Sequence, residues 1–88
     1  MDIVNQELMR TILQEIDSRL NEGIHPLHNE HLNHLCAEGE VLEYLLYLKT
    51  KGLISGNLVS RGTDQIPHRV VNIRLTYVGM KALRTVPN

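Results

Sequence analysis

Four histidines and a cysteine lie at close, regular spacing in the run HPLHNEHLNHLC and could bind a metal ion. They are His25, His28, His31, His34 and Cys36. Zinc needs imidazole and thiolate ligands that converge on one point. On an α-helix, positions three apart differ by about 300°, so the histidines of a helix here turn progressively away from one another. We therefore expect His28, His31 and His34 on the solvent face of a short helix, with His25 just before it, and expect no metal site.

Two other roles for the histidines stay open. His31 and His34 could supply half of a metal site that Cys36 or a second chain completes, although the common zinc signatures are absent. The five histidines of the chain could also act as a pH sensor. Histidine has an ordinary pKa of about 6.5, so protonation would add positive charge to a chain of formal net charge −1 and favour an anionic partner in acid.

No arrangement of residues typical of an enzyme is visible. His34 and Cys36 are two positions apart, so on a helix they point to different faces and cannot pair as base and nucleophile. The sequence contains no Gly-rich phosphate loop and no Gly-x-Ser-x-Gly motif. We expect no catalytic activity and no cofactor.

Length and composition indicate one small domain with an aliphatic core. The chain has 88 residues, 42% of them hydrophobic and only 3% aromatic, and it has a single cysteine. An intrachain disulfide is therefore impossible, and no apolar run approaches the roughly 18 residues of a membrane span. No signal-peptide pattern is visible either, so we expect a cytoplasmic protein that does not enter a membrane.

Charge is divided unevenly along the chain. Residues 1–43 contain nine acidic and two basic residues, whereas residues 44–88 contain seven basic and one acidic residue. Such asymmetry suggests a polar partner, which is either a nucleic acid at the basic end or a second protein.

Three helices are predicted in the first 52 residues. Apolar residues recur three and four positions apart in residues 5–23, where Asn5 is a plausible N-cap and Gly23 a plausible stop. Asn29 can cap a short second helix that ends near Leu35 and turns Leu32 and Leu35 inward. The third helix, EVLEYLLYLKTKG, ends at Gly52 and buries a stripe made of Val41, Leu45 and Leu48.

Two strands and a final helix should follow. Residues 53–60 and 70–75 read as strands joined by the turn-rich segment RGTDQIPHR. Strict alternation in the second strand would turn Val71, Ile73 and Leu75 inward, and Val70, Asn72 and Arg74 outward. Thr76 is a suitable cap for a last helix that contains Tyr77, Met80 and Leu83.

This α+β order of elements resembles that of winged helix-turn-helix domains, which have three helices, a two-stranded hairpin called the wing, and here a C-terminal helix. Two motifs strengthen the resemblance: L45-x-x-L48-x-x-x-G52-L53-I54 at the start of the wing, and L75-T76-x-x-G79-x-x-x-L83 after it. The similarity covers residues 5–84 of a single domain spanning residues 1–88, and it is greatest to short bacterial and prophage winged-helix proteins.

The resemblance implies DNA binding and transcription regulation, with the third helix in the major groove and the wing on the backbone or minor groove. Transferred to this chain, the implied DNA contacts are Arg61, Arg69 and Arg74 in the wing, with Tyr47, Lys49 and Lys51 on the third helix. Four basic groups in or beside the hairpin would give weak binding for a monomer, so we expect a homodimer if DNA is the ligand.

Acidic residues on the third helix support an alternative. Glu40 and Glu43 would oppose phosphate binding, whereas Leu46 and Tyr47 face away from the buried stripe beside them. An apolar centre with a polar rim is typical of a protein interface. The alternative prediction is therefore a winged-helix protein-interaction module, acting as an adaptor or inhibitor, that uses these four residues.

Overall fold

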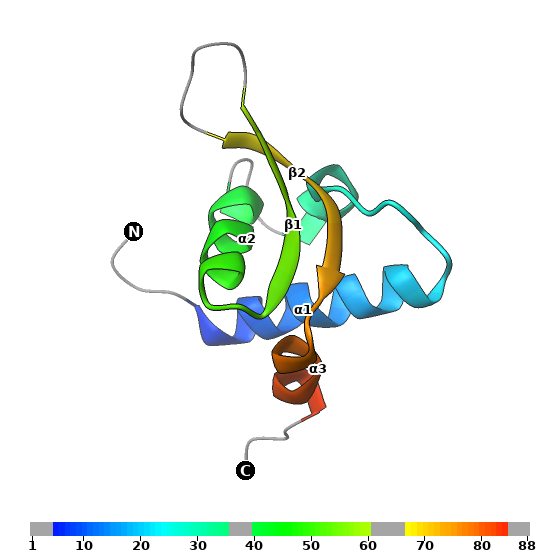
Figure 1. The fold of residues 1–88 in the computed structure, drawn as a ribbon. Helices are drawn as coiled ribbons and strands as arrows, with labels where there is room; N and C mark the ends of the chain where they lie inside the picture. Colours follow the sequence, from blue (N-terminus) through cyan, green and yellow to red (C-terminus); the bar gives the residue numbers. More distant parts are fainter. Residues whose placement is uncertain (1–4, 36–39, 61–66, 85–88) are drawn as a thin grey trace.

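The computed structural model of the protein describes residues 5–35, 40–60 and 67–84, so Cys36 and Arg61 lie outside the described residues. The elements, in order, are helix α1 (Gln6–Asn21), the 3-10 helix η1 (Asn29–Leu35), helix α2 (Glu40–Thr50), strands β1 (Ile54–Ser60) and β2 (Pro67–Leu75), and helix α3 (Tyr77–Arg84) (Figure 1). The described part of the chain is therefore α+β, with a two-stranded antiparallel sheet, as predicted.

Helix α1 begins and ends where the sequence predicts. The side chain of Asn5 accepts a hydrogen bond from the backbone N–H of Leu8 at 3.0 Å, which is the geometry of an N-cap. Gly23 adopts a φ of 91°, and the N–H groups of Gly23 and Ile24 donate to the carbonyls of Leu20 and Arg19. This Schellman arrangement satisfies two carbonyl groups at the end of the helix.

The second helical segment is a 3-10 helix rather than the α-helix assumed from the sequence. It is held against the hairpin by Asn29, which is buried and whose side chain accepts a hydrogen bond from the N–H of Val70 at 3.0 Å. The prediction that Asn29 caps the helix is therefore corrected, because its oxygen serves the outer edge of β2 instead. The N–H of Ile73 also donates to the carbonyl of Leu27 at 2.8 Å. Together these bonds cover the edge of β2 that β1 does not.

An irregularity in β2 overturns the predicted alternation. Ser55 pairs with Arg74 and Asn57 pairs with Val71, so β2 holds one extra residue between these pairs. The extra residue lies at Asn72, which has a φ of 56°, a left-handed conformation that asparagine tolerates better than most residues. As a result Val70 and Ile73 are both fully buried, and the prediction that Val70 points outward is wrong.

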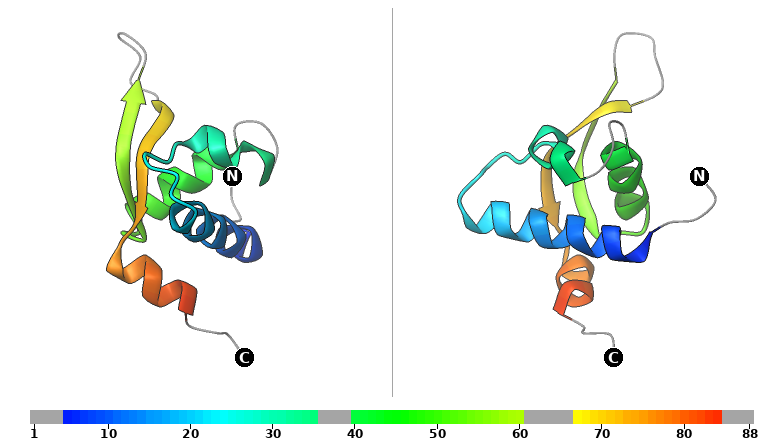
Figure 2. Two further views of the ribbon diagram at one scale, coloured as in Figure 1. Left: turned by 90° about the vertical axis from the view of Figure 1, so that its right-hand side faces the viewer. Right: turned by 180° about the vertical axis from the view of Figure 1, so that it is seen from behind.

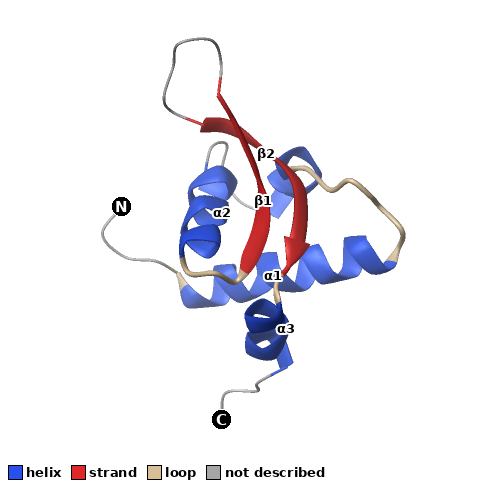
Figure 3. Ribbon diagram, viewed as in Figure 1, coloured by secondary structure: helices blue, strands red, loops and turns tan. Residues whose placement is uncertain are grey.

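Helices cover only one side of the hairpin. Seen edge-on, α1, η1 and α2 lie on one side of the two strands, and the other side of the strands is left without a helix (Figure 2). The face-on view coloured by secondary structure shows α3 below the base of the hairpin (Figure 3). The core fills the space between the layers and is almost entirely aliphatic; its fully buried members include Ile12, Ile16, Leu27, Leu32, Val41, Leu45, Leu48, Val70 and Ile73. The predicted stripe of Val41, Leu45 and Leu48 is thus confirmed.

The two sequence motifs that flank the hairpin meet at its base. Gly52, with a φ of 79°, ends α2, and the carbonyl of Gly52 accepts a hydrogen bond from the hydroxyl of Thr76 at 2.6 Å. The N–H of Thr76 donates to the carbonyl of Leu53, and the Thr76 hydroxyl accepts from the N–H of Gly79 as the predicted cap of α3. A Cβ atom at position 79 would collide with the Leu53 carbonyl, so the close approach of α3 requires glycine there.

Candidate interaction surface

The two described arginines of the hairpin, Arg69 and Arg74, are not arranged as a single DNA-binding group. The Arg69 guanidinium donates two hydrogen bonds to the Glu30 carboxylate, from Nε at 2.7 Å and from Nη2 at 3.2 Å. These hydrogen bonds lower the pKa of Glu30 below its ordinary value. Arg69 therefore fastens the strand to η1 with its charge largely compensated.

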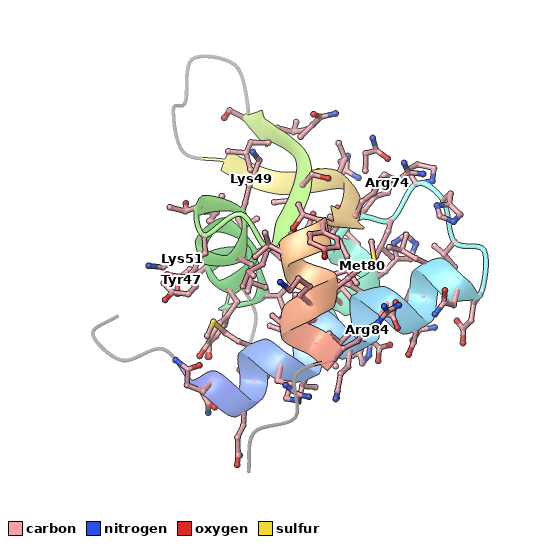
Figure 4. The ribbon with its side chains drawn as sticks, turned by 60° about the horizontal axis from the view of Figure 1, so that its bottom comes forward. Tyr47, Lys49, Lys51, Arg74, Met80 and Arg84 are labelled. Carbon is pink, nitrogen blue, oxygen red and sulfur yellow. The ribbon has the colours of Figure 1, made fainter. Side chains whose placement is uncertain are left out.

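Arg74 is exposed but lies at the base of the hairpin. It lines a shallow groove of about 320 Å³ together with Asp17, His25 and Met80, which belong to α1, the loop after it, and α3 (Figure 4). Its neighbours are thus the end of α1 and the start of α3. The structure separates Arg74 from Arg69, which lies toward the other end of β2.

The three residues predicted on the third helix, Tyr47 and Lys49 in α2 and Lys51 just after it, point to two different sides. Tyr47 and Lys51 lie together on the side away from the hairpin, with the Lys51 ammonium 5.5 Å from the centre of the Tyr47 ring. Lys49 is half-buried and lies on the hairpin side of the helix (Figure 4). The described residues among those assigned to DNA binding from the sequence are therefore spread over separate surfaces.

The predicted protein-binding surface is also altered. Of Glu40, Glu43, Leu46 and Tyr47, only Glu43 is exposed, and Tyr47 packs partly against the core. The exposure predicted for Leu46 and Tyr47 is therefore corrected, because both side chains are half-buried. The helix buries a wider face than the predicted stripe, because Tyr44 is only 5% exposed and its hydroxyl accepts a hydrogen bond from the N–H of Asn5. Sequence reasoning missed this role of Tyr44.

Large apolar side chains are exposed elsewhere. They are Tyr77 at 73%, Val78 at 53%, Leu58 at 44% and Met80 at 40%. Three of the four lie on α3, whose inward face is formed by Gly79 and by the half-buried Ala82 and Leu83. The sequence signal for this orientation is Gly79, because a glycine in the middle of a short helix marks the side of close approach.

Strand β1 presents an open edge. Its sequence, ISGNLVS, contains no charged residue and no proline, and among the described residues only β2 pairs with it. Edge strands of natural proteins usually carry charges, prolines or coverings that prevent further pairing. In this sheet such features lie on β2, which begins with Pro67 and is covered by residues 27–29.

The four histidines of residues 25–34 differ in their surroundings. His28 directly precedes η1, and the N–H of His31 donates to its carbonyl at 3.0 Å, so the two residues lie one 3-10 turn apart and their rings stack with centroids 5.6 Å apart. The Nδ1 atom of His31 accepts a hydrogen bond from the N–H of His28, and His34 lies 3.6 Å from Glu15. The expected solvent face of the helix is confirmed for His34, whereas His28 and His31 are half-buried and so less exposed than expected; His25 precedes the helix and is exposed. Across residues 5–35, 40–60 and 67–84, no three His, Cys, Asp or Glu residues are grouped to hold a metal ion.

Comparisons with known proteins add no identification. No protein-family model matches the chain, no curated protein matches its sequence, and no solved structure matches its fold. Within the described ranges, no helix is long and apolar enough to cross a membrane.

Proposed function

We propose that the chain has the winged-helix fold and acts as a protein-interaction module. The fold assignment is supported by the order of the elements, by the antiparallel hairpin between α2 and α3, and by the contact of the two flanking motifs at the base of that hairpin. In this reading α2 is the third helix of the fold and the hairpin is the wing.

The observation that carries the function is the exposure of Tyr77, Val78, Leu58 and Met80. Removing apolar surface from water is favourable by about 25 cal/mol for each Å² buried, and these four side chains leave that stabilisation unused. A protein interface would cover such side chains, since aromatic residues and methionine are enriched at the centres of interfaces. Nucleic acid, in contrast, requires clustered cations. Here Arg69 is paired with Glu30, and Arg74, Lys49 and Lys51 point to different sides.

The test compares peptide binding with DNA binding for the same protein. The wild-type chain is used as bait for a phage-displayed library of random 12-residue peptides, and it is titrated separately with generic duplex DNA at 50 mM salt. The proposal expects enriched peptides whose affinity changes little with salt, and no DNA binding at low micromolar protein concentration. Tight, salt-sensitive DNA binding without peptide enrichment would overturn it.

DNA binding remains a second candidate because no described carboxylate lies within ion-pair distance of Lys49 or Lys51. If these two lysines are the described phosphate contacts, the logarithm of the affinity should fall with the logarithm of salt concentration with a slope of about −1.8. A double variant, Lys49→Ala with Lys51→Ala, would then abolish binding. Such a small slope implies weak binding by a monomer, so regulation of transcription would require a homodimer.

A further inference from the structure

The outer edge of β1 offers unpaired backbone groups next to a helix. In an antiparallel pair, a strand directs alternate pairs of N–H and C=O groups toward its partner, so the remaining groups of residues 55–60 point away from β2. The pairing of the two strands is irregular between Ser55 and Asn57 and between Val59 and Ser60. In both places the extra residue lies on β2 and not on β1. β1 is consequently the regular strand, and its free edge keeps the spacing that a further strand would need.

Side chains beside this edge are apolar and incompletely covered. Leu58 pairs directly with Val70, which is fully buried, so both point to the face of the hairpin that carries the helices. Leu58 nevertheless remains 44% exposed. On α2, which contacts β1, the half-buried residues Leu42, Leu46 and Lys49 are four and three positions apart and share one stripe. Figure 4 places Lys49 on the side of α2 that faces the hairpin.

We propose that an extended segment of a partner protein pairs with the outer edge of β1 as a third strand and lies over the Leu42–Leu46–Lys49 stripe of α2. This proposal rests on the function proposed above and specifies its binding site. The main chain of the segment bonds to β1, an apolar side chain contacts Leu58 and Leu46, and an acidic side chain pairs with Lys49. Addition of a strand to an open edge is a common mode of peptide recognition.

The position of α2 argues for an extended segment rather than a second copy of this chain. In Figures 1 and 2, α2 lies beyond β1, on the side from which an added strand must approach. Suppose that the outer edge of β1 paired with the β1 of a second copy about a twofold axis. The α2 helix of each copy would then overlap the helix-covered side of the other copy's hairpin. A single extended segment carries no helix of its own, so it meets no such obstacle.

Charge argues for an acidic residue in the partner. β1 is uncharged, and no described carboxylate pairs with Lys49. Lys49 is half-buried beside apolar side chains, and an acidic group that approaches it in these partly desolvated surroundings is attracted more strongly than in open water. A segment that alternates apolar and polar residues and carries one Asp or Glu is therefore the complementary ligand.

The probe is the most enriched peptide from the phage-displayed 12-residue library, labelled with fluorescein and titrated by anisotropy. Lys49→Glu should weaken its binding about tenfold, because an attractive surface pair becomes a repulsive one. Leu58→Ser should weaken it about fivefold through lost apolar contact. Lys51→Glu makes the same charge change on the other side of α2 and should have little effect. A peptide with its acidic residue changed to Lys should bind Lys49→Glu better than it binds the wild type.

Hydrogen exchange separates strand addition from other modes of docking. Bound peptide should slow exchange at alternate amides of residues 55–60, namely those that point away from β2. Peptides that bind without this pattern, or whose affinity is equal in Lys49→Glu and Lys51→Glu, would overturn the proposed site. If peptide binding is unaffected by Lys49→Glu but is abolished by the double variant Tyr77→Ser with Met80→Ser, the protein-interaction function holds and only the β1 site is wrong. Failure to enrich any peptide would count against both.

Discussion

Replacing Gly79 with alanine should destabilise the protein, although the same change in an isolated helix would stabilise it. In the middle of a helix, alanine is favoured over glycine by about 1 kcal/mol. In this structure the added Cβ atom would occupy the position of the Leu53 carbonyl, which belongs to backbone and cannot rotate away. Helix α3 must therefore move away from the end of α2.

The cost follows from the bonds that this movement breaks. The Thr76 N–H donates to Leu53 at 3.1 Å, and the Thr76 hydroxyl donates to Gly52 at 2.6 Å. Losing two hydrogen bonds costs about 1 kcal/mol each, and forced repacking adds a further 1 kcal/mol or more. After the gain in helix propensity is subtracted, Gly79→Ala should lower the free energy of unfolding by about 2 kcal/mol, or the melting temperature by about 10 °C.

Urea denaturation followed by circular dichroism measures this difference. The control is Val78→Ala, one position earlier on the exposed side of α3, which should change the free energy of unfolding by less than about 0.5 kcal/mol. If Gly79→Ala proves as stable as the wild type, or more stable, then α3 does not approach α2 as closely as described and the reasoning fails.

Three further changes test the hairpin and its attachments. Asn72→Val should lower the free energy of unfolding by about 1 to 2 kcal/mol, because a β-branched residue is strained at a φ of 56°, whereas Asn72→Gly should be tolerated; equal urea midpoints for the two variants would argue against the bulge. Asn29→Ala should cost about 1 to 3 kcal/mol by leaving the buried N–H of Val70 without an acceptor, and a midpoint shift below a few tenths of a molar urea would contradict that contact. Glu30→Gln should cost less than about 1 kcal/mol at pH 7, because the pair with Arg69 is partly exposed. Since the pKa of Glu30 is lowered on folding, its contribution is present above the ordinary carboxyl pKa and lost as the pH falls through the folded value, so wild type and Glu30→Gln should converge in acid; a constant difference would refute the linkage.

Local signals in the sequence predict the elements well. The stripe of α1, its cap at Asn5 and the glycine stops at positions 23 and 52 depend on neighbouring residues alone, and the structure confirms each of them. The strands fall close to their predicted positions for the same reason, because both are bounded by turn-forming residues.

Contacts between distant residues are what the sequence could not predict. The sequence alone predicts that Arg69 is a free arginine of the hairpin. In the structure it is paired with Glu30, which lies 39 positions away in the chain. Val70 is buried because of a bulge at Asn72, which a strictly alternating pattern cannot reveal. The exposure predicted for Tyr47 on α2 was similarly too high, because Tyr47 packs against the core, and the burial of Tyr44 against Asn5 was not predicted. Local periodicity specifies each element, whereas the surface depends on how the elements meet.

The hydroxyl of Thr76 donates to the carbonyl of Gly52, two residues after the end of α2, and accepts from the N–H of Gly79 in the first turn of α3. A partner that binds the exposed apolar side of α3 and displaces this helix should therefore also displace the C-terminal end of α2. The two helix ends should therefore move together, because the hydrogen bond between Thr76 and Gly52 holds them at a fixed distance.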